Sequence, residues 1–155
     1  MDAAPLLQQI AQALARVGLE AIMIGNAAAA LHGAPVTTLD IDFMFRKTAQ
    51  NLKKLKLLAD ALDARISKPF YPVSSLYRLV NDETGIQLDF MTELHGIKSF
   101  ESLRADAVTV EFGGYPIKVA SLAQIIRSKK ALGRPKDLAV LALLEQTLDA
   151  KKNAC

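Results

Sequence analysis

Residues 25–45 read Gly-Asn-Ala-Ala-Ala-Ala-Leu-His-Gly-Ala-Pro-Val-Thr-Thr-Leu-Asp-Ile-Asp-Phe-Met-Phe. This stretch gives the strongest indication of the fold. From Leu39 to Phe45 the side chains alternate as in a strand with one buried face, which turns Asp40 and Asp42 to the opposite side. Two acids on one face of a largely buried strand repel each other and resist desolvation. They therefore require a compensating cation, either an Arg or Lys side chain or a divalent metal ion.

A second segment repeats this pattern and carries a third acid. From Ile86 to Met91 the apolar residues again alternate, and Asp89 lies on the other face. The tripeptide Asp-Phe-Met occurs in both segments. If the two strands are neighbours in one sheet, Asp40, Asp42 and Asp89 converge on a patch that can hold one or two hard cations such as Mg²⁺. Arg78, if in phase with the acids, is a candidate counter-charge.

The residues just upstream predict a phosphate-binding turn. Ala21 to Ile24 is expected to be a short buried strand, Gly25 the turn, and Asn26 the N-cap of a helix from Ala27 to Leu31. Backbone N–H groups at a helix start bind anions, phosphate above all, and the alanines leave room for a ligand. The sequence thus predicts a phosphate cradle beside a metal site.

These residues resemble the nucleotidyltransferase superfamily that includes DNA polymerase β, in its minimal, AbiEii-like form. Members pair a glycine turn with a strand carrying acid-x-acid and a third acid on a later strand. The resemblance covers about Ala21 to Leu141. It is carried by Gly25-Asn26, His32-Gly33, Thr38, Asp40-x-Asp42 and Asp89, and near the C-terminus by Lys129, Lys130, Arg134, Lys136 and Asp137, which resemble a Lys-rich helix followed by Arg-x-Lys-Asp.

The resemblance implies an enzyme that uses Mg²⁺ or Mn²⁺ to move a nucleoside monophosphate from an NTP such as ATP to an acceptor hydroxyl or similar group. By analogy, Asp40 and Asp42 bind the metal, and Asp89 positions it or takes the acceptor proton. Nucleotide-binding residues follow from the same motifs: Gly25, Asn26, Thr38, Lys129, Lys130, Arg134 and Lys136. His32 is expected to be structural, because a helix C-terminus offers it free carbonyls.

Other functions remain open at this point. Asn26 stands where the superfamily has a second glycine or serine, and Val36 stands where the AbiEii-like group has an Arg. A non-catalytic nucleotide- or partner-binding module of the same fold fits these two departures. A third alternative is the toxin or antitoxin half of a two-protein system. RNA, a protein and a small molecule all remain candidate acceptors, and the basic residues near the C-terminus equally suit a solvated helix face.

Composition indicates one ordinary globular domain spanning residues 1–155. Charged residues make up 23% of the chain, and a net charge of +3 favours an anionic substrate such as an NTP without demanding RNA. The single Cys155 suits a reducing cytoplasm. No stretch reaches transmembrane length, so we expect no membrane partner.

The predicted fold class is α+β in layers: a nucleotidyltransferase-like mixed sheet flanked by helices, with a short C-terminal helical segment. Besides the strands above, we predict two further strand pairings, the hairpin of Ser75–Val80 with residues 86–91 and the hairpin of Val108–Phe112 with Tyr115–Val119. The predicted helices are Ala4–Val17, Ala49–Ala64 with Thr48 as cap, a short one near Phe100–Ala105, Leu122–Leu132 with Ser121 as cap and Gly133 as stop, and Pro135–Leu148. Residues 67–72 are predicted to be a loop.

Overall fold

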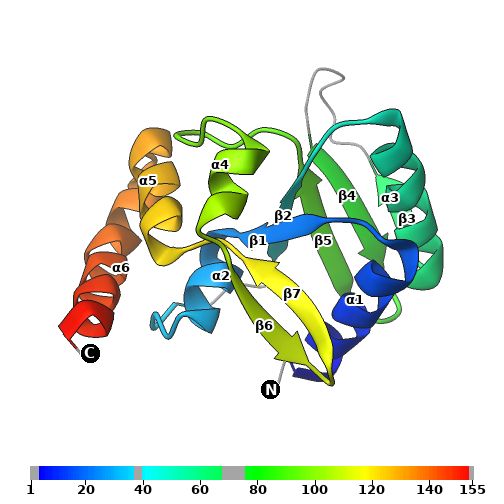
Figure 1. The fold of residues 1–155 in the computed structure, drawn as a ribbon, viewed down its shortest axis with the longest axis horizontal. Helices are drawn as coiled ribbons and strands as arrows, with labels where there is room; N and C mark the ends of the chain where they lie inside the picture. Colours follow the sequence, from blue (N-terminus) through cyan, green and yellow to red (C-terminus); the bar gives the residue numbers. More distant parts are fainter. Residues whose placement is uncertain (1–3, 37–39, 68–75, 154–155) are drawn as a thin grey trace.

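The computed structural model describes residues 4–36, 40–67 and 76–153, and it contains one mixed sheet in the order β3-β4-β5-β2-β1-β7-β6 (Figure 1). Its strands are β1 (Ala21–Ile24), β2 (Ile41–Phe45), β3 (Arg65–Ser67), β4 (Leu76–Asn81), β5 (Ile86–Met91), β6 (Val108–Phe112) and β7 (Tyr115–Val119). The helices are α1 (Ala4–Val17), α2 (Gly25–Leu31), α3 (Ala49–Ala61), α4 (Phe100–Ala105), α5 (Leu122–Leu132) and α6 (Pro135–Asn153). This arrangement confirms the predicted fold class.

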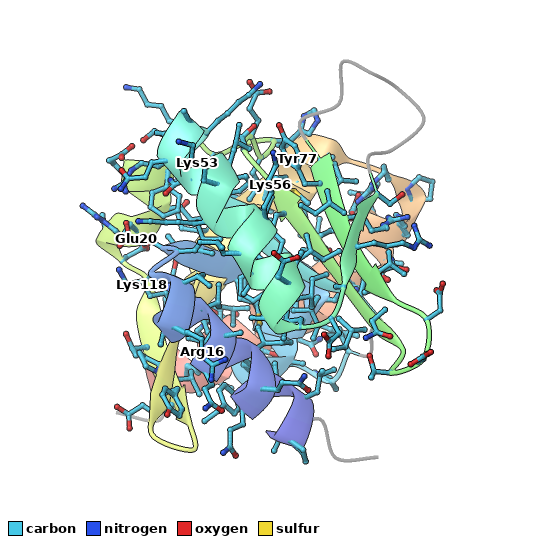
Figure 2. All side chains as sticks on the ribbon, turned by 90° about the vertical axis from the view of Figure 1, so that its right-hand side faces the viewer. Arg16, Glu20, Lys53, Lys56, Tyr77 and Lys118 are labelled. Carbon is cyan, nitrogen blue, oxygen red and sulfur yellow. The ribbon has the colours of Figure 1, made fainter. Side chains whose placement is uncertain are left out.

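The helices form two layers around the sheet. Helices α1 and α3 contact each other on one side, while α2, α5 and α6 follow one another on the other side (Figure 1). Lys53 and Lys56 project from α3 and Arg16 from α1 on the face turned to the viewer in Figure 2, and all three side chains are exposed. Lys53 and Lys56 thus lie on a solvent face of α3.

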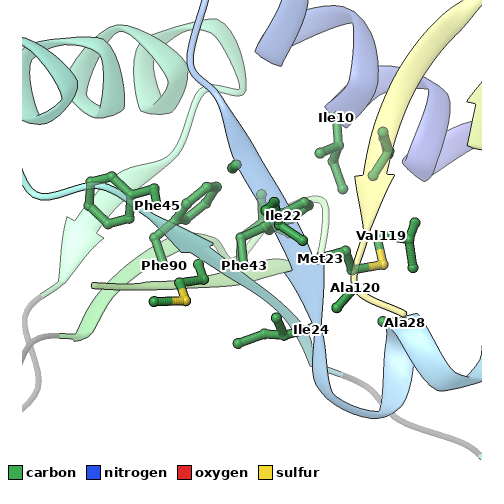
Figure 3. Close-up of a cluster of buried hydrophobic side chains, with 14 of the residues drawn as sticks. Ile10, Ile22, Met23, Ile24, Ala28, Phe43, Phe45, Phe90, Val119 and Ala120 are labelled. Carbon is green, nitrogen blue, oxygen red and sulfur yellow. The ribbon is translucent and has the colours of Figure 1, made fainter. Parts of the chain in front are cut away.

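The apolar core is centred on the two middle strands (Figure 3). Phe43 of β2 and Phe90 of β5 are register partners with stacked rings whose centroids are 5.0 Å apart. Phe45 meets the edges of Phe90 and Tyr77, and the three phenylalanines are fully buried. Because side chains alternate along a strand, this packing fixes the opposite face of the same strands as the place for Asp42 and Asp89.

Several predicted elements match the structure closely. The helix α1 and the strand β1 have the predicted bounds, and the hydroxyl groups of Thr48 and Ser121 cap α3 and α5 by accepting backbone N–H groups. Gly133 ends α5 with φ +63°, a left-handed conformation that glycine adopts without strain. These matches rest on local signals, which a sequence carries in full.

The predicted helix to Ala64 is too long, and one strand was not predicted. The helix α3 ends at Ala61, where Leu62 caps it, and the chain then turns through Asp63 at φ +52° into β3. Strand β3 is only three residues long and owes its conformation to antiparallel pairing with β4, a non-local partner. The helix α6 runs beyond the predicted Leu148 to Asn153. Within the described residues, no helix is long and apolar enough to span a membrane.

Candidate functional site

Three charged side chains lie in one row across the middle of the sheet. Asp42 is the register partner of Asp89 in the parallel β2–β5 pair, and Asp89 is the partner of Arg78 in the antiparallel β4–β5 pair. The strand pairing assumed from the sequence is therefore confirmed. Arg78 donates two hydrogen bonds to Asp89, from Nε to Oδ1 at 2.8 Å and from Nη2 to Oδ2 at 3.2 Å. The predicted counter-charge thus belongs to Asp89.

Asp40 lines the same cavity but faces a different neighbour. Its Oδ1 accepts a hydrogen bond of 3.1 Å from Gln87 Nε2, one strand over and two residues before Asp89. Among the described residues, no group of three or more His, Cys, Asp or Glu side chains is arranged to hold a metal ion by itself. Asp42 and Asp89 are consequently the two adjacent carboxylates, with Asp40 set apart from them.

Asp42 carries the least compensated charge of this row. Burial raises the pKa of Asp42 to about 6, and the negative charges of Asp89 and Asp40 act in the same direction. Lys129 and Arg78 act against them only in part. In the part of the chain that the structure describes, the Asp42 carboxylate makes no hydrogen bond or ion pair. A cation at this position would relieve the repulsion between the two acids.

Gly25 lets the backbone approach this carboxylate closely. It has φ +71°, and a Cβ atom added to it would lie 3.0 Å from Asp42 Oδ2. The glycine is therefore required both for its conformation and for the space it leaves. The predicted cap at Asn26 is wrong: helix α2 begins at Gly25, the N-cap position is Ile24, and no side chain caps it. Asn26 lies in the first turn, because the strand β1 runs directly into the helix.

We expect Gly25→Ala to weaken both stability and any ligand binding at Asp42. A left-handed conformation costs an alanine roughly 1 to 2 kcal/mol relative to glycine, and the new methyl group displaces the carboxylate. Thermal melting of the two proteins measures the first effect. Gly33→Ala is the matched control, because Gly33 also has positive φ but a Cβ there meets nothing within 4 Å. Equal losses in ligand binding for both variants would contradict the role given to Gly25.

A cluster of cations approaches the acids from the joint between α5 and α6. Lys129, Arg134 and Lys136 all line the cavity. Lys130 is the fourth basic residue that was predicted to bind nucleotide. It forms a 3.2 Å ion pair with Glu145 of α6 and does not line the cavity. Lys130 and Arg134 do not share a helix face, because α5 ends at Leu132, before Arg134. The predicted stop at Gly133 already indicated this break.

The cavity enclosed by these elements has a volume of about 460 Å³. Its charged part holds the acids and the three cations, and its other part is formed by apolar side chains such as Leu94, Leu103 and Ile125. Sequence reasoning did not assign several polar residues that line it: Glu93, His95, Gln124 and Ser128. Gln124 and Ser128 are one turn apart on α5, a spacing that could have indicated a shared face.

The remaining predicted residues have varied positions. Asn26 lines the cavity, and its Oδ1 is the one buried side-chain polar atom without a hydrogen-bond partner among the residues described. Thr38 lies outside the described residues. His32 lies at the C-terminus of α2, but its Nε2 lies 2.8 Å from the carbonyl oxygen of Ala120, which directly follows β7, rather than beside a carbonyl of its own helix. Burial lowers the pKa of His32, which favours a neutral ring there.

One protein-family model covers nearly the whole chain. The model of the family described as "Nucleotidyl transferase of unknown function (DUF2204)" matches residues 4–154. The chain belongs to this nucleotidyltransferase family. The superfamily expected from the glycine turn and the acids is thereby confirmed at the level of nucleotidyltransferases. No curated protein matches the chain.

Solved structures with a similar fold include an antibiotic-resistance factor and an antibiotic adenylyltransferase. The solution structure of the antibiotic-resistance factor ANT(2″)-Ia is 18% identical with a TM-score of 0.65, over 98% of this chain and 88% of that one. Its crystal structure with adenylyl-2″-tobramycin gives 19% and 0.60, over 96% and 91%. The lincosamide antibiotic adenylyltransferase LnuA, with lincomycin bound, gives 13% and 0.65, over 95% and 98%. At these identities the likeness establishes that the nucleotidyltransferase has their fold.

Proposed function

We propose that this nucleotidyltransferase transfers a nucleoside monophosphate from an NTP to an acceptor hydroxyl in a reaction that depends on Mg²⁺ or Mn²⁺. One observation carries the proposal. Asp42 and Asp89 lie in register on adjacent strands at the wall of a cavity that also receives Lys129, Arg134 and Lys136. Paired carboxylates beside a cluster of cations suit a substrate that joins a metal ion to a triphosphate.

The residues present fit a magnesium ion. Mg²⁺ is commonly bound through one or two carboxylates together with substrate phosphates, so a pair of acids is sufficient. The raised pKa of Asp42 and the like charge of Asp89 mark a position where a cation is favoured. Asp42 and Asp89 would hold the ion, with Asp40 at the edge. When bound, the metal would neutralise charge on the triphosphate and polarise the phosphorus that is attacked.

The side chains that line the cavity have different roles in the proposed reaction. Lys129, Arg134 and Lys136 bind and orient the phosphates, because cations in a partly enclosed cavity stabilise the charge that develops on the leaving pyrophosphate. The acceptor oxygen attacks the α-phosphorus, the bond to the bridging oxygen breaks, and the hydroxyl proton passes to a carboxylate. Asp89 holds the acceptor or takes this proton, and Arg78 keeps it oriented. The Asn26 amide supplies a further polar contact.

The AbiEii-like subtype and the acceptor belong to the proposal as well. Lys129, Arg134 and Asp137 all line the cavity and form ion pairs with one another, Asp137 with each of the two cations, which supports the likeness of the C-terminal motif. The solved structures of the same fold contain adenylyl-2″-tobramycin or lincomycin. Tobramycin and lincomycin are therefore the first small acceptors to test here, next to RNA and protein.

We expect Mg²⁺ with an NTP to stabilise the protein against thermal unfolding. A ligand bound only by the folded state, at about a hundred times its Kd, adds roughly 2.7 kcal/mol. For a chain of this size that corresponds to a rise in Tm of very roughly 5 to 10 °C. Melting with each of the four NTPs and with metal alone measures the effect. Absence of any shift at millimolar nucleotide and metal would contradict nucleotide binding altogether.

Labelling separates the enzyme from the non-catalytic module. The protein is incubated with each α-labelled NTP, Mg²⁺ and either cell lysate, tobramycin or lincomycin, and the labelled product is identified. Transfer to one acceptor class supports the enzyme, and a labelled partner protein or RNA would point to a two-protein system. Binding of an NTP without any labelled acceptor would favour the binding module instead.

A further inference from the structure

Asp137 is almost fully buried, yet it contacts two of the cations that line the cavity. It lies in the first turn of α6 and is 1% exposed. Arg134 donates to both of its oxygens, from Nε to Oδ2 at 2.6 Å and from Nη2 to Oδ1 at 3.1 Å. The Lys129 ammonium lies 3.7 Å from Oδ1. One carboxylate thus contacts two cations, Lys129 from α5 and Arg134 from the connection between α5 and α6.

The geometry of the joint makes this sharing possible. Gly133 ends α5 in a left-handed conformation, and α6 begins two residues later at Pro135. The turn brings the first turn of α6 back against the last turn of α5. Asp137 stays ionised, because the hydrogen bonds from Arg134 hold the pKa of the Asp137 carboxyl below its usual value. Its lone pairs are then available to both cations.

Lys129 has a second acid within its electrostatic reach. Its side chain is only 11% exposed, and burial lowers the pKa of its ammonium, whereas Asp137 and Asp42 both raise it. Asp42 lies across the cavity at the proposed metal position. If Asp137 lost its charge, the strongest remaining attraction on Lys129 would come from Asp42.

We propose that Asp137 is a positioning residue that aims Arg134 and Lys129 at the phosphates of a bound nucleotide. This inference rests on the proposed function, since it gives the two cations a common substrate. The α5–α6 joint is then part of the substrate site, because it sets the direction of the Arg134 and Lys129 side chains. Asp137 also lines the cavity, but both of its oxygens are bonded by Arg134.

Positioning and simple charge predict opposite results. Asp137→Asn removes a negative charge beside two cations, so Coulomb attraction alone predicts tighter binding of a polyanion. If Asp137 orients the cations, the same change weakens binding, because the bidentate contact and the ammonium position are both lost. The sign of the change in Kd therefore distinguishes the two.

The experiment measures the Kd of inorganic tripolyphosphate and of ATP, each with Mg²⁺, by calorimetry. We expect Asp137→Asn to weaken binding by about tenfold or more, as the loss of charge-assisted hydrogen bonds does. Asp137→Glu, which keeps the charge, should recover part of the affinity. Glu145→Gln is the matched control on the same helix, because its partner Lys130 lies off the cavity wall, and its affinity should equal that of wild type.

If Asp137→Asn does not fold, Arg134→Lys provides a second test. This change keeps the net charge, and the Arg134 side chain is half-exposed. A lysine does not reproduce the two-point contact, so tripolyphosphate affinity should fall about fivefold or more. Wild-type affinity in Arg134→Lys, or equal or tighter binding in a folded Asp137→Asn, would overturn the inference and leave the proposed function intact. Wild-type protein that binds neither ligand would overturn both.

Discussion

Replacing Asp42 by Asn is expected to make the metal-free protein more stable at pH 7, while stabilisation by Mg²⁺ with NTP and any nucleotidyl transfer are lost. Burial and the charges of Asp89 and Asp40 raise the pKa of Asp42 to about 6. A shift of about two pKa units from the ordinary value corresponds to roughly 3 kcal/mol at most. Because Asn keeps the shape and removes the charge, we expect a gain of roughly 1 to 3 kcal/mol in EDTA.

The pH dependence has a defined sign. A raised acid pKa means that the folded state binds a proton more readily than the unfolded chain, so the charge of Asp42 destabilises the fold above about pH 6. This cost fades as pH falls through 6 and is absent below the unfolded pKa of about 4. The advantage of Asp42→Asn over wild type should therefore be constant above pH 7 and disappear between pH 6 and 4.

Melting of wild type and mutant in EDTA from pH 4 to 8 measures this difference, because acids distant from Asp42 contribute equally in both proteins and cancel. Asp60→Asn is the matched control, since it removes one negative charge from an exposed position on α3. A loss of stability in EDTA with an intact shift by Mg²⁺ and NTP would show that Asp42 is a structural acid. The catalytic role proposed for it would then fail.

Arg78→Gln is expected to destabilise the metal-free protein by roughly 1.5 to 3 kcal/mol, the range of a lost hydrogen bond to a charged group. The Asp89 side chain is only 9% exposed, and without Arg78 it would lie beside Asp42 with no cation bonded to it. The repulsion between the two acids would rise, because Arg78 now lowers the pKa of Asp42 as well. Mg²⁺ should restore part of the loss by taking the place of the missing charge.

The double change Arg78→Gln with Asp89→Asn tests the origin of this loss. Replacing both partners leaves no unpaired charge, so most of the stability lost in Arg78→Gln should return, and the cycle gives the coupling between the two residues. Denaturant unfolding in EDTA and in Mg²⁺ provides the measurements. If the double variant is no more stable than Arg78→Gln, the loss comes from packing of the Arg side chain rather than from the ion pair.

The acids could be predicted from the sequence because their signal is local. The alternation around Asp42 and Asp89 fixes which face each side chain occupies, and the paired strands then bring the two together. The caps at Thr48 and Ser121 and the stop at Gly133 are equally local. Only the pairing of β2 with β5 joins distant parts of the chain.

The parts that could not be predicted depend on tertiary contacts. The burial of Asp137 and its hold on Lys129 follow from the angle between α5 and α6, which the sequence does not state. Strand β3 exists through its pairing with β4. Asn26 was expected to be the N-cap because its side chain can accept a backbone N–H. Strand β1 runs directly into α2, however, so the N-cap position is Ile24.

The sheet order also has a consequence for folding kinetics. Strand β2 pairs in parallel with β5, and β1 with β7, so the middle of the sheet joins segments that are far apart in the chain. Such non-local pairings form slowly, since a long loop must close before the contacts stabilise it. We therefore expect the row of Arg78, Asp89 and Asp42 to be completed only after the folding barrier, so that a nucleotide bound there acts mainly on the unfolding rate. Ligand would then extend the lifetime of the folded chain and leave its refolding rate almost unchanged.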